Sequence, residues 1–217
     1  MKKLISTILL ILVLTVSVAV AAACGGTENG EQSGFKTYTM EAEYTDLTGV
    51  YGGGHSAEAT GVDMIYGDGT DAQKEMGWSS GYFVAFTHKE GVKLTFRFES
   101  SAAVSNATIE LRVGSEMGEL TFTPQSFEIS LNGETIDYGN MTVANSPVLG
   151  EMKFYDKTIS NSAALKEGEN ILTLTVLANE LAGGTTAGPI IDCVKITTSA
   201  TLKWNDKTDN PANRGSI

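Results

Sequence analysis

The chain has few of the residues from which zinc sites are commonly built. Only two of its 217 residues are cysteine and only two are histidine. Neither a His-x-x-x-His nor a Cys-His spacing occurs, so the common zinc motifs are excluded. Cys193 lies within the apolar stretch 189–196, which predicts a buried and unreactive thiol.

Basic residues are also scarce. The chain has 15 Lys and Arg against 26 Asp and Glu, a formal charge of -11. Residues 1–23 contain two lysines and no acid, so the remainder has 13 basic against 26 acidic side chains, or -13. Such a chain is repelled by phosphate backbones, and we expect no nucleic-acid partner. Neutral ligands and cations stay open.

No long stretch keeps the hydrophobic period of an amphipathic helix. From Thr37 onward apolar residues instead tend to alternate with polar ones, and Gly, Asn, Asp and Ser clusters separate the runs. This pattern predicts an all-β protein, an antiparallel sandwich or barrel. The expected strands are 38–43, 82–86, 92–98, 107–113, 127–131, 154–159, 170–177 and 190–198.

Two segments show this pattern in detail. In 92–98 every second residue is apolar, which places Val92, Leu94, Phe96 and Phe98 on the core face. In 127–136 the pair Asn132-Gly133 supplies the positive φ angles of a tight hairpin turn. The chain is therefore expected to fold back there.

The first residues have the parts of a secretory signal peptide. Lys2 and Lys3 precede an apolar run over 4–20, and the small residues 21–23 lead into Cys24. This arrangement resembles the lipobox of bacterial lipoproteins, which implies lipid attachment at Cys24 and display on the extracellular face of the bacterial cell membrane. Cys193 would then have no disulfide partner. Two alternatives stay open: ordinary cleavage after 21–23, giving a secreted protein, and a permanent transmembrane anchor.

The composition divides the chain into four parts. Residues 1–23 are the expected signal peptide, and the Gly-rich polar residues 24–36 are expected to form a flexible tether. Residues 37–204 are long enough for one sizeable β domain. Residues 205–217 form a polar C-terminal tail.

Five short strings of the β domain resemble, in the same order, segments of family 6 and family 35 carbohydrate-binding modules. The most specific is 165–174 (LKEGENILTL); the others are 41–43 (EAE), 80–84 (SGYFV), 129–133 (ISLNG) and 191–196 (IDCVKI). The resemblance covers about residues 38–198. It implies a jelly-roll β-sandwich of the galactose-binding-like type.

The resemblance also implies a structural Ca²⁺ ion. In these families a Glu-x-Glu motif in the first strand and an Asp opening the last strand commonly hold calcium, which points here to Glu41, Glu43 and Asp192. Residues two apart on a strand share one face, and a hard cation prefers several oxygen ligands. The alternative is a pair of solvated glutamates at the start of a strand.

A sugar-binding surface needs an aromatic ring that stacks on the sugar and polar groups beside it. Trp78 lies in a Gly/Ser-rich stretch before a predicted strand, and Tyr51 and Tyr66 lie in the long segment that precedes it. The resemblance implies a loop asparagine, for which Asn179 is the nearest candidate. The alternative for Trp78 is a place in the core beneath the loop.

Together these patterns predict a non-catalytic, calcium-stabilised surface lipoprotein that binds a polysaccharide or glycan. It would contact the membrane through its lipid alone, and glycan-degrading enzymes are its expected partners. Two alternatives remain. One is a structural or protein-interaction module of the same fold without a sugar site, and the other is a small glycan-cleaving enzyme.

Overall fold

The structure is a computed structural model. It describes residues 34–48, 65–67 (backbone only), 79–85, 87, 90–115, 118–144, 153–178 and 188–205. These residues belong to one compact unit, Gly34–Ile217. The predicted signal peptide, nearly all of the tether and nearly all of the C-terminal tail lie outside the described residues and stay predictions. Within the described part of the chain, no helix is long and apolar enough to cross a bilayer.

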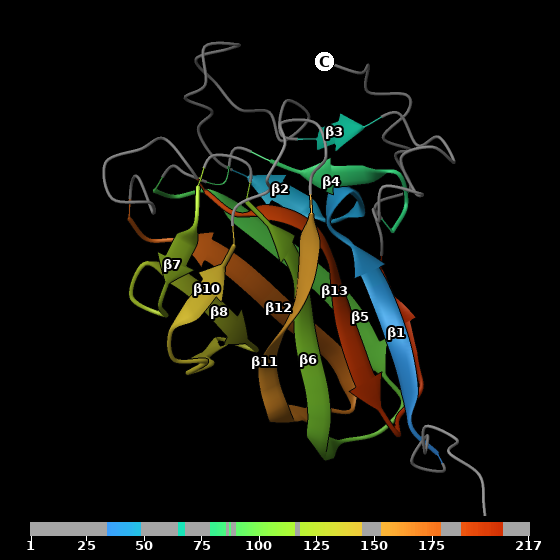
Figure 1. Ribbon diagram of the computed structural model, residues 1–217. Helices are drawn as coiled ribbons and strands as arrows, with labels where there is room; N and C mark the ends of the chain where they lie inside the picture. The colour runs from blue at the N-terminus through green and yellow to red at the C-terminus, as the bar shows by residue number, and fades with distance from the viewer. Residues whose placement is uncertain are drawn as a thin grey trace, which may run out of the picture. The chain divides into compact units, whose positions relative to one another are not determined.

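Six strands form the first sheet. Their hydrogen-bonded order is β11-β6-β13-β4-β3, and β1 also pairs with β13. Strands β1 and β4 therefore follow one another along the same edge of β13, and β1, β13, β6 and β11 lie side by side in Figure 1. The strands are β1 (Lys36–Glu41), β3 (Ile65–Gly67), β4 (Tyr82–Val84), β6 (Val104–Gly114), β11 (Phe154–Leu165) and β13 (Ile190–Thr198).

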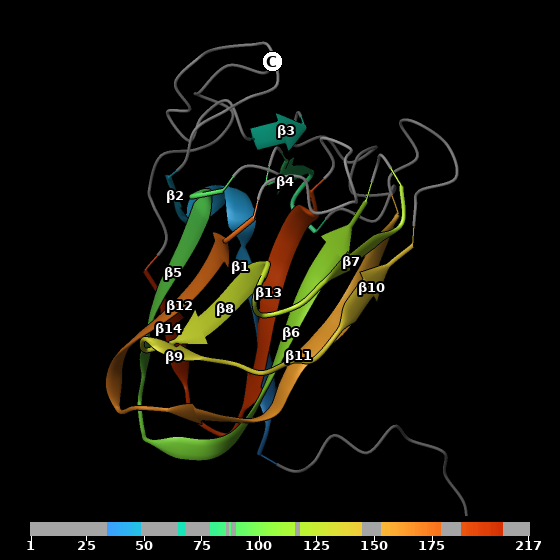
Figure 2. The same cartoon turned by 90° about the vertical axis from the view of Figure 1, so that its left-hand side faces the viewer.

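A second sheet packs against the first, and Figure 2 shows the two layers on opposite sides. Its order is β14-β5-β12-β8-β9, and β2 also pairs with β5. These strands are β2 (Asp46–Thr48), β5 (Lys93–Ser100), β8 (Phe127–Leu131), β9 (Glu134–Thr135), β12 (Gly168–Val176) and β14 (Leu202–Trp204). A separate two-stranded sheet pairs β7 (Leu120–Phe122) with β10 (Met141–Val143).

The chain passes from one sheet to the other at many of its connections. Strands β4, β5 and β6 alternate between the sheets, and so do β11, β12, β13 and β14. All strand pairs are antiparallel, as this winding requires of a jelly roll. The prediction of an all-β antiparallel sandwich of the jelly-roll type is confirmed.

The core lies between the two sheets and follows the predicted alternation. Leu94, Phe96 and Phe98 of β5 are fully buried, whereas the residues between them face outward. Across from them β6 contributes Ala107, Ile109, Leu111 and Val113. The predicted hairpin is also present, since Asn132 and Gly133 have φ angles of 56° and 85° between β8 and β9.

One local expectation is wrong. The first strand ends at Glu41, and Ala42–Tyr44 form a short 3-10 turn, η1, instead of continuing the strand to Glu43. The turn carries the chain from β1 in the first sheet to β2 in the second. Glu41 and Glu43 therefore do not share a strand face, and their approach to one another has another cause.

Candidate functional site

The candidate site lies where β1 ends and β4 begins along one edge of β13. Glu41, the last residue of β1, is paired with Cys193, and Val84 of β4 is paired with Ile191. Asp192 lies between these two partners, at a register shift of β13 against β6. Such β-bulges redirect a side chain out of the regular ladder. The junction therefore places Asp192 close to the ends of both neighbouring strands.

Three carboxylates at this junction hold one short segment. The backbone N–H of Ser79 donates to Asp192, at 3.1 Å from Oδ1 and 3.3 Å from Oδ2. The Ser79 hydroxyl donates to Glu41 Oε2, and the Ser80 hydroxyl donates to Glu43 Oε1. All three predicted metal ligands thus contact Ser79 or Ser80, and we call Glu41, Glu43 and Asp192 the carboxylate cluster.

Two members of the cluster are fully buried, and one of these has an oxygen without a hydrogen-bond partner among the described residues. The side chains of Glu43 and Asp192 are both 0% exposed. Glu43 Oε2 has no hydrogen-bond partner among the described residues. A buried carboxylate oxygen without a donor costs about 1–3 kcal/mol or more, because the group has lost its water. In the part of the chain that the structure describes, no donor offsets the burial of this Glu43 oxygen.

Burial also shifts the protonation of the cluster. It raises the pKa of Glu41 to about 7 and that of Glu43 to about 8, although the Ser79 and Ser80 hydroxyls lower them in part. Burial raises the pKa of Asp192 as well, against the opposing effect of its hydrogen bonds with Ser79 and of Arg112. The carboxyls also raise one another's pKa values, since like charges repel. A bound cation would reverse these shifts.

The donor set fits a hard divalent cation. Carboxylate oxygens of three side chains, with two serine hydroxyls beside them, are the oxygen ligands that Ca²⁺ prefers. As they stand, however, no three His, Cys, Asp or Glu side chains in the described ranges are grouped closely enough to hold an ion. The serine hydroxyls donate to oxygens of Glu41 and Glu43 that a metal would use.

The structure does not describe the side chain of any predicted sugar-binding residue. Tyr51, Trp78 and Asn179 lie outside the described residues. Tyr66 belongs to β3, where its backbone is paired with Phe83 of β4, and its side chain is not described. Their roles stay predictions. What the structure adds is that Ser79, the residue after Trp78 in the sequence, is held by Glu41 and Asp192.

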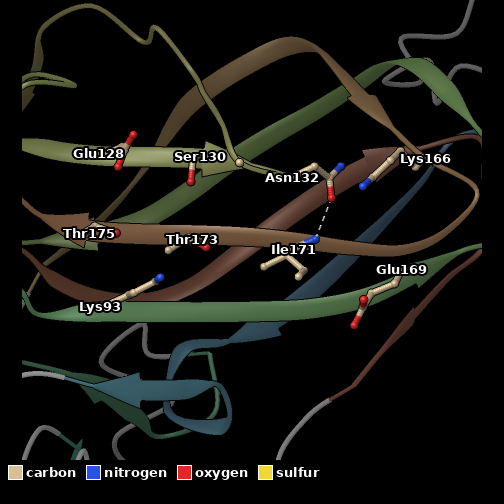
Figure 3. A pocket seen from close by; sticks show the side chains of 10 residues that line it. Lys93, Glu128, Ser130, Asn132, Lys166, Glu169, Ile171, Thr173 and Thr175 are labelled. Carbon is tan, nitrogen blue, oxygen red and sulfur yellow. Dashed lines mark hydrogen bonds between the residues drawn. The ribbon is translucent and has the colours of Figure 1, made fainter.

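A groove of about 350 Å³ lies on the outer face of the second sheet. Figure 3 shows it along β8 and β12, where Ser130 and Thr173 lie near Ile171. Asn132 closes one part of it, and its Oδ1 accepts from the Ile171 backbone N–H at 3.1 Å. The described residues that line it include no aromatic ring; they are Lys93, Glu128, Ser130, Asn132, Gly133, Lys166, Glu169, Ile171, Thr173 and Thr175.

Sequence reasoning missed the groove and the two serines. The outward positions of a half-buried strand are usually polar, so Thr173 and Thr175 gave no signal, and only the apolar Ile171 departed from the pattern. Ser79 and Ser80 had no signal as carboxylate partners. They are separated from Asp192 by more than a hundred positions, and local sequence carries no information on that contact.

A scan against protein-family models finds no match, and a search of curated proteins finds no relative. Among solved structures, the chain is similar to the family 35 carbohydrate-binding module (CBM35) of Cellvibrio japonicus Abf62, at 14% identity and a TM-score of 0.47, over 79% of this chain and 99% of that one. It is also similar to the Podospora anserina GH26-CBM35 β-(1,4)-mannanase, at 15% identity and a TM-score of 0.47, over 74% of this chain but 27% of the mannanase.

A third similar structure is a family 36 module in complex with calcium and xylotriose. It is 12% identical with a TM-score of 0.45, over 73% of this chain and 98% of that one. The chain thus spans about a quarter of the mannanase and nearly the whole of the two separate modules. Family 35, one of the two families that the sequence resembles, is represented among these structures.

Proposed function

We propose that this protein is a non-catalytic carbohydrate-binding surface lipoprotein, and that calcium stabilises the region around its predicted sugar-binding residue Trp78. The observation that carries the proposal is the carboxylate cluster, which holds Ser79 and Ser80 directly after Trp78. A ring that stacks on a sugar contributes only about 0.5–1.5 kcal/mol beyond its area burial. The entropy lost when a freely moving ring is ordered on binding would offset that gain. Holding Ser79, the residue next to Trp78, would reduce this entropy cost.

Calcium would complete the anchor. Glu41, Glu43 and Asp192 would hold the ion, which supplies the positive charge that the unpartnered Glu43 Oε2 lacks. With the ion bound, the three carboxyls would stay ionised at neutral pH. The Ser79 and Ser80 hydroxyls beside these carboxyls would then serve as oxygen ligands of the ion, which would fix the residues directly after Trp78.

Display at the cell surface follows from the lipobox-like sequence at Cys24. The lipid would tether the protein to the outer face of the membrane, where it would hold a polysaccharide or glycan close to glycan-degrading enzymes. A fatty-acid probe should label the protein in cells, and Cys24→Ser should abolish the label. Label that persists in this variant would refute the anchor.

Glycan binding is tested with the compact unit Gly34–Ile217 on a glycan array and in affinity gels that contain polysaccharides. We expect single-site affinities of about micromolar to millimolar, since one stacked ring and a few hydroxyl contacts provide the energy. Trp78→Ala should lose retention and keep its melting temperature.

The matched control is Trp204→Phe. Trp204 packs against the core and meets the Tyr44 ring edge-on at 6.2 Å between centroids. Its replacement should leave glycan retention unchanged. If Trp78→Ala unfolds instead, Trp78 is a core residue and the platform must be sought at Tyr51 or Tyr66. If the parent protein binds no glycan on a broad panel, the sugar-binding proposal is wrong and the interaction-module alternative takes its place.

A further inference from the structure

Arg112 connects the carboxylate cluster to the exposed face of the first sheet. It lies on β6, paired with Cys193 of β13 on one side and with Asp156 of β11 on the other. Its Nε is 3.1 Å from Asp192 Oδ2. Its Nη1 donates to both oxygens of Asp156, each at 3.3 Å. One guanidinium therefore bridges a fully buried carboxylate and a partly exposed one.

The position of Arg112 is fixed from both ends. Asp156 also accepts from Lys195 Nζ, at 2.9 and 3.0 Å, so Asp156 is itself held in place. A guanidinium stays protonated at all physiological pH values, and its planar fork matches carboxylates. A positive charge therefore lies beside the carboxylate cluster, against one oxygen of Asp192.

We propose that Arg112 is a specificity-determining residue of the metal site, because it occupies Asp192 Oδ2 and lowers the negative charge of the cluster, favouring a divalent over a trivalent cation. This inference rests on the proposed calcium site. The structure supports it independently through the direct contact of Arg112 with Asp192, the one cluster residue whose carboxylate already has a cationic partner within salt-bridge distance among the described residues.

The charge of the bound ion makes the proposal measurable. The Coulomb energy between a fixed charge and an ion is proportional to the charge of the ion. Removing one positive charge beside the site must therefore change the binding free energy of a trivalent ion by about one and a half times as much as that of a divalent ion of the same size. A residue that only supports the fold would weaken both ions in equal proportion.

The test measures Ca²⁺ and Tb³⁺ binding to the purified protein by isothermal titration calorimetry near neutral pH. Arg112→Gln should tighten Ca²⁺ binding about tenfold and Tb³⁺ binding about thirtyfold, in the ratio that the ion charges require. Arg112→Lys keeps the charge and should keep the wild-type ratio of the two affinities. Arg97→Gln removes a positive charge from the outer face of the second sheet and should change neither affinity.

Asp156→Asn keeps the test decisive if Arg112→Gln does not fold. It removes a partly exposed negative charge and leaves both Arg112 and Lys195 in place. Ca²⁺ binding should weaken about threefold and Tb³⁺ binding about fivefold. If either variant shifts both ions equally, or in the opposite direction, Arg112 does not set specificity although the metal site stands. If the wild-type protein binds neither ion, both this inference and the proposed calcium site are wrong.

Discussion

Replacing Glu43 by glutamine should stabilise the metal-free protein and remove its response to calcium. Glu43 is 0% exposed, its Oε1 accepts from Ser80, and its Oε2 is unpartnered among the described residues. Burial raises its pKa to about 8, from an ordinary value of 4.5. In neutral solution without metal, folding therefore keeps this carboxyl largely protonated, whereas the unfolded chain ionises it freely. Glutamine has the shape of the protonated acid and cannot ionise in either state.

The magnitude follows from the size of the pKa shift. A rise from 4.5 to about 8 corresponds to an upper limit of about 5 kcal/mol lost by the folded state at pH values above 8. Glutamine avoids this loss but buries an amide N–H₂ where Oε2 had no partner, which costs about 1–3 kcal/mol. We therefore expect a net gain of about 2 kcal/mol in the free energy of unfolding at pH 8 in chelator. Below pH 4.5 both chains are uncharged at this position, so only the cost of the buried amide remains and the variant should be less stable than the wild type by about 1–3 kcal/mol.

Calcium should reverse the order of the two proteins. An ion that binds only the folded state stabilises it by about 2.7 kcal/mol at a hundredfold excess over Kd. The variant lacks one of the three carboxylates and should gain little. Urea unfolding followed by tryptophan fluorescence, with chelator and with calcium at pH 8, measures all four free energies.

The matched control is Glu99→Gln, an exposed glutamate on the outer face of β5. It should change neither the stability in chelator nor the response to calcium. If Glu43→Gln is less stable than the wild type in chelator at pH 8, the interpretation of Glu43 as a destabilising buried acid is wrong. If it responds to calcium as the wild type does, Glu43 is no ligand.

Three further outcomes are expected. The pKa values of Glu41 and Glu43 are raised to about 7 and about 8 in the folded protein. The stability of the metal-free protein should therefore fall as the pH rises from 4.5 to 8 and level off above pH 8. A melting temperature in chelator that stays constant over this range would contradict the raised pKa values. The buried Cys193 thiol contacts Ser79. In a Cys24→Ser background, the reaction of Cys193 with a thiol reagent should therefore speed up when chelator removes calcium. Equal rates with and without calcium under native conditions would refute the anchoring of Ser79, and the unfolded chain in urea should show no difference between the two conditions. Asn170→Ala should lower the free energy of unfolding by about 2–4 kcal/mol in urea melts. The reason is that the buried Asn170 amide makes four hydrogen bonds, two to Lys166, one to Gly168 and one to Asn132. The control Asn161→Ala, on the exposed face of β11, should leave the free energy of unfolding almost unchanged.

Asn170 also shows how much of the fold could be read from sequence. The string 165–174 was the most specific part of the family resemblance, although alternation alone gives no reason for its asparagine. In the structure Asn170 faces inward like Leu172 and Leu174, and its amide closes the turn before β12. A polar residue at a core position of an otherwise regular strand was the available signal. Its hydrogen bonds could not be assigned without the turn geometry.

How well the sequence predicts a strand depends on the length of the strand. Long runs such as β5 and β12 expose a clear alternation, so the sequence predicts them to within a few residues. Strands β2, β7 and β10 are three residues each, which is too short for a period to be recognised. The turn η1 was missed for a related reason. Its buried Ala42 and Glu43 continue the alternating composition of β1, while the backbone has already left the extended conformation.

The candidate site was predictable as a set of residues and not as an arrangement. Family resemblance selected Glu41, Glu43 and Asp192, and the argument from strand periodicity for bringing the first two together was wrong. The contact of all three with Ser79 and Ser80 unites them instead. That contact depends on how β1 and β4 share the edge of β13, which is a property of the sheet topology and not of any local segment.

The bulge in β13 explains how one strand can serve both the core and the site. Ile191 is paired with Val113 and Val194 with Leu111, and all four side chains are buried in the core. Between these pairs β13 has two residues, Asp192 and Cys193, where β6 has Arg112 alone. In a regular ladder a single residue would separate the two core positions, and a second would turn Val194 away from the core. The extra residue thus supplies the cluster with a carboxylate against Arg112 while the core register on both sides of it is preserved.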